Sequence, residues 1–133
     1  MTEPTAIPTP EQMVGLIIQN PLFRSVERSH LEQLSDQLGW VVLAQNELLF
    51  REGDEADALY FLVEGRLEVF KEQPNSAGNA ESTKLTLAEI RPGSAVGEMQ
   101  LLTGGRRSAS VHALQPSGLI RFPKTAFDRL LAR

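Results

Sequence analysis

The feature that most constrains the fold is a change in hydrophobic pattern at Gly39. Beyond this residue, short runs rich in β-branched, aromatic and leucine side chains alternate with turn sequences. Many short strands joined by glycine-bearing turns are typical of an antiparallel sandwich or barrel. The predicted strands are 40–44, 47–50, 58–63, 66–71, 84–90, 94–97, 108–114 and 117–122.

Helical patterns lie on both sides of this β-region. Thr9 is placed to cap a helix that begins at Pro10, with Gln12 completing a capping box, and Asn20-Pro21 ends it. The C-terminal residues from Pro123 onward return to helical spacing. The expected helical face there consists of Phe127, Leu130 and Leu131.

A second N-terminal helix is predicted just before the β-region. Ser29 and Glu32 have the spacing of another capping box, and Gly39 is a plausible C-terminal stop. Leucines 31, 34 and 38 would line one face of this helix. The predicted order is therefore two helices, an antiparallel β-unit and a short C-terminal helix.

Two further segments are predicted to be irregular. Glu64-Gly65, between two strong apolar runs, is interpreted as a tight hairpin turn. Residues 72–83 are small and polar and predict a long, mobile hairpin loop, which we interpret as a tolerated surface insertion. Residues 1–8 contain two prolines and few apolar side chains, so we expect a disordered lead-in, with one domain over 9–133.

Composition excludes several classes of function. The net charge of −4 over 133 residues argues against nucleic-acid binding, which needs a basic face. There is no cysteine, which removes disulfides and thiolate metal sites. No apolar run has the length of a membrane span, and the N-terminus lacks the pattern of a secretory signal. The expected location is the cytoplasm.

The chemistry of the chain is concentrated in the stretch AVGEMQLLTGGRRSASVHAL, residues 95–114. Side chains alternate faces along a strand. From Arg107 onward, one face carries Arg107 followed by small apolar residues, whereas the other carries Arg106, Ser108, Ser110 and His112. Arg107 is therefore predicted to point inward and to need an anion, while Arg106 points to solvent.

Two anions could satisfy Arg107. Glu98 could pair with it directly, or both residues could serve a ligand, with Arg107 binding a phosphate and Glu98 accepting hydrogen bonds from hydroxyls. Residues 98–102 are long enough for one or two helical turns, and Gly97 before them permits close backbone approach. From chemistry alone, the structural ion pair and the ligand site are equally supported.

The segment VGEMQLLTGGRRSASVHA resembles the phosphate-binding cassette of cyclic nucleotide-binding domains. A second segment upstream, LLFREGDEADALYFLVEGRLEV, is similar to the other signature of that family. Two separate motifs in the right order are more specific than a lone short motif. The matching positions are Gly53, Ala56, Leu59–Leu62, Gly65, Gly97, Glu98, Leu101, Arg107, Ser108, Ala109 and Val111.

The resemblance implies an α+β fold, an antiparallel β jelly-roll barrel with N-terminal helices, a short cassette helix and a C-terminal helix. It implies that Glu98 accepts from the ribose 2′-hydroxyl and that Arg107 pairs with the cyclic phosphate. Gly97 would permit the close approach, and the backbone N–H groups of Met99 and Gln100 would face the phosphate or sugar. Ser108 would touch the phosphate or a guanine amino group.

The sequence departs from the family pattern at four positions: Phe50, Val96, Gln100 and Arg106. Gln100 matters most, because it replaces a small residue within the cassette helix and could crowd the sugar–phosphate. None of these changes removes the acid or the base of the cassette.

The resemblance implies a regulatory sensor without catalytic activity or cofactor, whose ligand is cyclic AMP or cyclic GMP, with cyclic AMP expected on family frequency. Such domains are fused to transcription factors, kinases, channels, transporters or patatin-type esterases. The sequence shows no such effector and no pattern for a further C-terminal lid helix, so we expect a fragment of a longer protein. An effector domain in the same or another chain is the expected partner.

Three other functions compete with this interpretation. A degenerate member could keep the fold and act only as an interaction module. A cupin-type metal enzyme would need convergent ligands, but the two histidines, His30 and His112, are far apart in sequence and are interpreted as surface residues. A hydrolase is disfavoured because there is no G-x-S-x-G elbow and no evident acid to orient His112.

Overall fold

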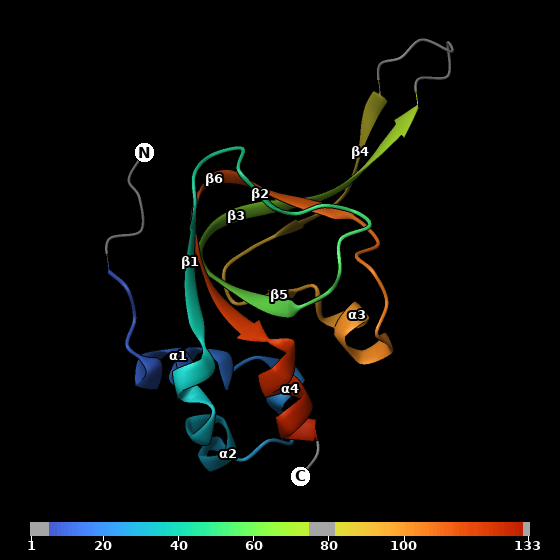
Figure 1. The fold of residues 1–133 in the computed structure, drawn as a ribbon. Coiled ribbons are helices and arrows are strands. Elements are labelled where there is room, and N and C mark those ends of the chain that lie inside the picture. The colour runs from blue at the N-terminus through green and yellow to red at the C-terminus, as the bar shows by residue number, and fades with distance from the viewer. Residues whose placement is uncertain (1–5, 75–81, 132–133) are drawn as a thin grey trace.

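The structure is a computed structural model that describes residues 6–74 and 82–131. It confirms the predicted class, an antiparallel β-structure of jelly-roll type with helices before and after it in the chain. The strands are β1 (Gly39–Leu43), β2 (Leu48–Phe50), β3 (Ala58–Pro74), β4 (Ser82–Ile90), β5 (Ala95–Val96) and β6 (Ser110–Pro123). The helices are α1 (Pro10–Ile17), α2 (Arg28–Gln33), α3 (Glu98–Thr103) and α4 (Lys124–Leu131), with short 3-10 turns η1 (Pro21–Phe23) and η2 (Ser35–Gln37). The terminal helices α1, α2 and α4 lie together at one end of the sheet (Figure 1).

The two N-terminal helices test the two predicted capping boxes. The first is confirmed: the Thr9 hydroxyl accepts from the Gln12 backbone N–H at 3.1 Å, and the Gln12 side chain accepts from the Thr9 N–H at 2.8 Å. The second is wrong, because α2 begins at Arg28, with Glu27 at its N-cap and no capping side chain. The chain already turns before Ser29, where the His30 N–H donates to the Glu27 carbonyl, so no serine cap is needed.

Strand β3 is continuous where the sequence predicts a hairpin at Glu64-Gly65, and that prediction is wrong. Both halves of β3 pair with the same strand, β6, and the register shifts between Leu62 and Leu67. Gly65 has φ +109° at this irregularity. The Ser117 hydroxyl of β6 lies opposite, where it accepts from the Arg66 N–H at 3.2 Å. The apparent turn is therefore a bulge that bends a long strand.

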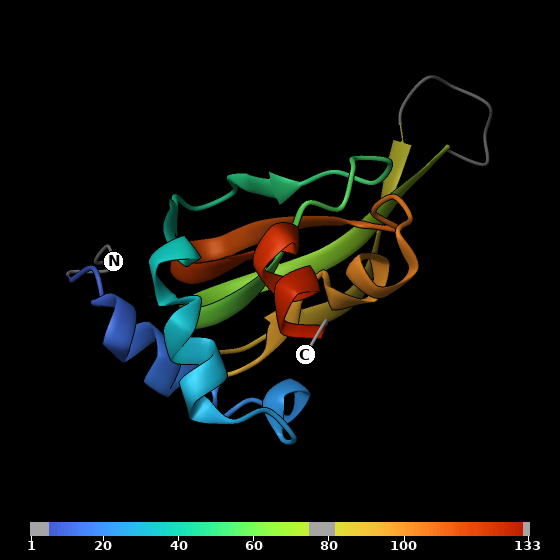
Figure 2. The ribbon, with the colours of Figure 1, turned by 60° about the horizontal axis from the view of Figure 1, so that its bottom comes forward.

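The two long strands, β3 and β6, organise the sheet. They pair with each other along most of their length, and each changes its outer partner along the way (Figure 2). Strand β6 meets β1 at one end and β2 at the other, and β3 meets β5 and then β4. The two strands predicted at 108–114 and 117–122 are consequently one strand.

The loop between β3 and β4 is shorter than predicted. Residues 72–74 pair with residues 82–84, so both ends of the expected loop are strand instead. The middle of that loop lies outside the described residues. Most of the predicted lead-in over residues 1–8 also lies outside them, and residues 6–8 have no regular secondary structure.

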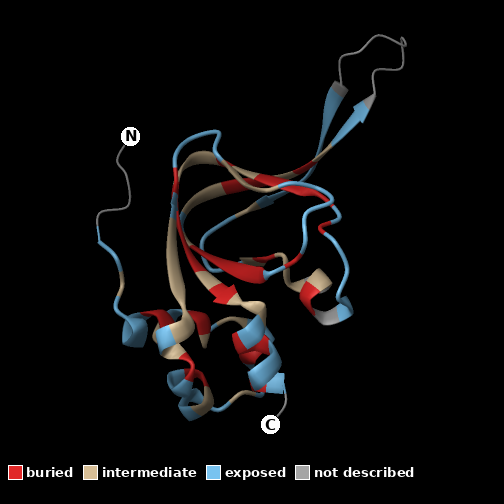
Figure 3. Ribbon diagram, in the orientation of Figure 1, coloured by how far each residue is buried: buried red, intermediate tan, exposed pale blue. Residues whose placement is uncertain are grey.

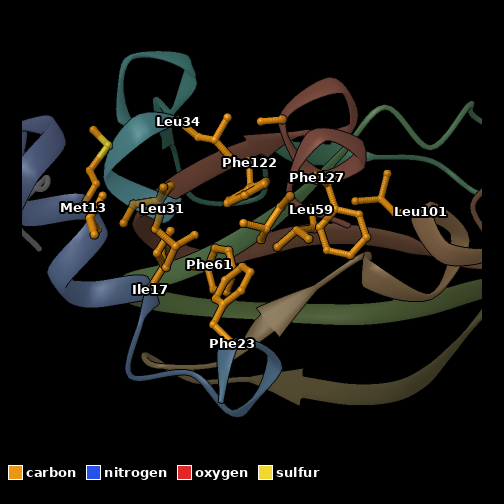
Figure 4. Close-up of a cluster of buried hydrophobic side chains, with 14 of the residues drawn as sticks. Met13, Ile17, Phe23, Leu31, Leu34, Leu59, Phe61, Leu101, Phe122 and Phe127 are labelled. Carbon is orange, nitrogen blue, oxygen red and sulfur yellow. The ribbon is translucent and has the colours of Figure 1, made fainter. Parts of the chain in front are cut away.

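The buried side chains form two clusters, one between the helices and the sheet (Figure 4) and one within the curl of the sheet. Figure 3 marks the buried residues along the ribbon. The first is built around aromatic rings: the ring centroid of Phe23 lies 5.5 Å from those of both Phe61 and Phe122, and Phe127 of α4 packs edge-on against Phe122. Leu130 joins this cluster, but Leu131, predicted on the same face, is 60% exposed. The helix presents only a narrow stripe to the core.

A buried carboxylate, that of Glu68, joins three strands of the sheet through its hydrogen bonds. The Glu68 side chain of β3 accepts hydrogen bonds from Lys84 Nζ and Thr86 Oγ1 of β4, each at 2.7 Å, and Glu68 Oε1 lies 2.7 Å from His112 Nε2 of β6. These bonds to Lys84, His112 and Thr86 lower the pKa of Glu68 from 4.5 to about 2. Three neighbouring strands are thus tied by one side chain.

This carboxylate predicts a loss of stability in acid. A carboxyl group whose pKa is lower in the folded state stabilises the protein above its unfolded pKa, and that contribution disappears as the pH falls from about 5 to about 2. We expect it to be about 2 kcal/mol, because the half-exposed Lys84 is screened by solvent. Urea unfolding at pH 7, 4 and 2.5 should show a gap between the wild type and Glu68→Gln that closes in acid. Parallel pH profiles for the two proteins would contradict this assignment.

Candidate functional site

The cassette helix α3 lies between two glycines in the left-handed region. Gly97 has φ +89° at its N-cap and Gly104 has φ +75° at its C-cap. Any side chain at Gly97 would clash with Nη1 of Arg107, whereas space beside Gly104 is open. The sequence predicts that Gly97 permits close approach of a ligand, and in the structure the group that approaches it closely is the Arg107 guanidinium.

Arg107 is buried, as strand parity predicts, and its contacts are internal. It is 3% exposed, whereas Arg106 is exposed and donates to the Gly53 carbonyl at 3.0 Å. Arg107 Nη1 donates to the Gly97 carbonyl at 3.0 Å and Nη2 donates to the Ala58 carbonyl. The guanidinium therefore ties the start of α3 to the start of β3.

The other face assigned by parity needs two corrections. Strand β6 begins only at Ser110. Ser110 is buried rather than facing solvent, and its hydroxyl accepts a hydrogen bond from the Glu52 backbone N–H at 2.9 Å. His112 is half-buried against Glu68, an acid that sequence analysis did not find. These contacts come from Glu52, which follows β2, and from Glu68 of the neighbouring strand β3, and alternation along β6 alone does not reveal them.

Two residues that sequence analysis did not assign to the site contact Arg107. Asp57 Oδ1 lies 3.8 Å from Arg107 Nη2, and the Phe50 ring centroid lies 4.0 Å from the guanidinium carbon. Phe50 departs from the family pattern, and its ring is a cation–π partner of Arg107. Asp57 also approaches Arg121 Nη2, at 3.3 Å.

Glu98, the predicted acid of the site, is not the partner of Arg107. It stands in the first turn of α3 and is partly exposed. Among residues 6–74 and 82–131, its carboxylate makes no hydrogen bond or ion pair. Arg107 therefore forms its ion pair with Asp57 and not with Glu98. The Glu98 carboxylate is left available for other hydrogen-bond donors.

A small pocket of about 80 Å³ lies beside α3. Three predicted site residues, Gly97, Gln100 and Ser108, line it. Gln100 Nε2 donates to the Ser108 hydroxyl at 3.3 Å across the pocket. Its remaining walls are apolar and come from Phe50, Val69, Val96, Ala109 and Val111.

The buried cation Arg107 adjoins this pocket, because it contacts two of the lining residues, Gly97 and Phe50. Burial lowers the pKa of Arg107, because desolvation disfavours the cation. Arg107 Nε is buried without a hydrogen-bond partner among the described residues. An unsatisfied N–H on a buried cation is a costly arrangement that an anionic ligand would relieve. Met99 lies in α3, so its backbone belongs to the same helix turn.

Comparison with known families identifies the class. The model of the cyclic nucleotide-binding domain matches residues 40–133, and the chain belongs to this family. The match includes the whole cassette and the upstream glycine-bearing segment.

The chain matches very different shares of the individual relatives. The chain is 36% identical over 93 residues to a lysophospholipase of Neurospora crassa, covering 70% of this chain and 6% of that relative. A cyclic nucleotide-binding-like protein from Brucella abortus has a TM-score of 0.72 at 28% identity, covering 90% of this chain and 97% of that one. The regulatory domain of Toxoplasma gondii PKA with cAMP has a TM-score of 0.79 at 16% identity, covering 92% and 45%, which shows the same fold.

The described part of the chain has neither a helix suited to crossing a membrane nor a cluster of metal ligands. None of its helices is long and apolar enough to cross a membrane. Within the same residues, no group of three or more His, Cys, Asp or Glu side chains is arranged to hold a metal ion.

Proposed function

We propose that this chain is a regulatory sensor of a cyclic nucleotide, with cyclic AMP as its expected ligand and cyclic GMP as the competing one. Glu98 would accept from the ribose 2′-hydroxyl, and Arg107 would bind the cyclic phosphate. The backbone N–H groups of Met99 and Gln100 would complete the phosphate contacts, with Gly97 and Ser108 at the edge of the site. The domain itself would carry no catalytic activity.

The observation that carries this proposal is the state of Arg107. Its guanidinium is buried and cationic, and one N–H lacks an acceptor. It stands directly behind the cassette pocket, because Gly97 and Phe50 contact it and also line the pocket. The phosphate of a cyclic nucleotide is the anion that the family resemblance assigns to this position.

The alternative is a degenerate domain that binds no nucleotide and acts by protein contacts. It is supported by the small pocket and by the Gln100–Ser108 hydrogen bond that spans it. Ligand pockets usually enclose about 300–1,000 Å³, so this site would have to open to admit a nucleotide. Isothermal titration calorimetry with cyclic AMP and cyclic GMP separates the two functions. Saturable heat is expected, whereas no heat at millimolar ligand from the folded protein would leave only the interaction module.

The larger protein is also a proposal. The chain spans about 6% of the length of the lysophospholipases it matches. An attached effector of the esterase type is consistent with those relatives and with the fusions expected from the family. We expect this sensor to control such an effector, with its nucleotide supplied from the cytoplasm.

Glu98→Gln tests the assignment of the ribose contact. The amide keeps the size of the side chain but replaces one acceptor oxygen by a donor, so cyclic AMP should bind about tenfold more weakly, the scale of one charged hydrogen bond. The same variant should bind 2′-deoxy cyclic AMP as well as the wild type does, because that ligand lacks the hydroxyl. Calorimetry measures both affinities. An equal loss for both ligands would show that Glu98 acts elsewhere.

A further inference from the structure

The pocket beside α3 contains its own polar contact. Gln100 and Ser108 supply the polar side chains of its lining, and the other side chains there are apolar. Gln100 Nε2 donates to Ser108 Oγ at 3.3 Å, which joins the cassette helix to the chain just after Arg107. The two polar groups that an incoming ligand would meet are therefore bonded to each other.

We propose that Gln100 is an affinity-limiting residue whose carboxamide, bonded to Ser108, closes the cassette and must be displaced by the ligand. This inference rests on the proposed function, because it concerns the affinity of that same site. We call the Gln100–Ser108 contact the cassette latch. A ligand that binds here must break the latch and move the Gln100 side chain aside, because this side chain lines a pocket of only about 80 Å³.

The closed latch has a cost for every ligand. A state that must open before binding reduces the apparent affinity by the fraction of molecules that are open. A long hydrogen bond between neutral groups that are partly exposed to water shifts this equilibrium only modestly, by about threefold to tenfold. The latch would thus raise the ligand concentration at which the domain responds without abolishing binding.

The test is calorimetry of cyclic AMP binding to the wild type, Gln100→Ala, Ser108→Ala and the double variant. Gln100→Ala should bind about threefold to tenfold more tightly than the wild type. The gain from this substitution should be smaller in the Ser108→Ala background, because the latch is already broken there. Gln19→Ala is the matched control, since its carboxamide also donates one hydrogen bond, to the Gly15 carbonyl at 2.9 Å, away from the cassette.

The outcomes separate this inference from the proposed function. If the wild type binds and Gln100→Ala binds equally or more weakly, the latch is wrong and the sensor remains. An equal gain in both backgrounds also overturns the latch, because the hydrogen bond would then play no part. Binding by Gln100→Ala alone would support the latch and show that the wild-type site is closed. No heat from any folded variant would remove the sensor function and the latch with it.

Discussion

Replacing Gly65 with alanine should cost about 3–5 kcal/mol of folding stability, a large part of the usual total for a domain. Gly65 has φ +109°, where a side chain costs about 1–2 kcal/mol. Its Cβ would also lie 2.6 Å from the Cα of Ser117. That neighbour is backbone of β6 and cannot rotate away, so the two central strands would have to separate. Urea unfolding monitored by circular dichroism measures the loss.

Gly93→Ala is the matched control for this prediction. Gly93 has a similar φ of +97°, but a Cβ there meets nothing within 4 Å. This variant should therefore lose only the backbone cost of about 1–2 kcal/mol. If the two variants are destabilised equally, the close approach of β3 and β6 at the bulge does not contribute to stability.

Removing Arg107 should have the largest effect on ligand binding. Arg107→Ala should weaken cyclic AMP binding by about 2–3 kcal/mol, or about 30-fold to 150-fold, the scale of a charge-assisted phosphate contact. The same change leaves the carbonyls of Gly97 and Ala58 without their donor, so stability should also fall. Calorimetry under conditions where thermal unfolding shows the variant to be folded separates these two effects.

Arg106→Ala is the control on the neighbouring position. Arg106 is exposed, and it donates a hydrogen bond to the Gly53 carbonyl, outside the pocket. It should change affinity by less than about threefold. Equal losses for the two variants would mean that both arginines act only through the general electrostatic field. The Arg107→Lys variant should also bind cyclic AMP weakly. One ammonium group cannot hold both carbonyls and a phosphate in the planar geometry of guanidinium.

The parts of the fold that sequence analysis predicted are those encoded by local pattern. The capping box at Thr9 and Gln12 depends on residues three apart, and the structure contains both of its hydrogen bonds. The β-rich middle follows from short apolar runs between turn residues. The sequence identifies Gly65 as a special backbone position, but the predicted hairpin turn is wrong. A bulge and a turn both favour a glycine with positive φ, so the residue alone does not distinguish them.

The cassette shows the same division. Its location, the inward direction of Arg107 and the outward direction of Arg106 follow from the residues between 95 and 114. The partners of Arg107 do not, since Ala58 is 49 residues away in the chain and Phe50 and Asp57 come from the same distant region. Only strand register brings them together.

By itself, the sequence determined the class of fold, the family signature and the arginine that is buried, because periodicity, turn chemistry and motif spacing are properties of neighbouring residues. The tertiary structure decided that Asp57 rather than Glu98 pairs with Arg107, that Gly65 bends a strand, and that Gln100 bonds to Ser108. Those contacts depend on how distant strands align and how closely their backbones approach, which no local pattern specifies.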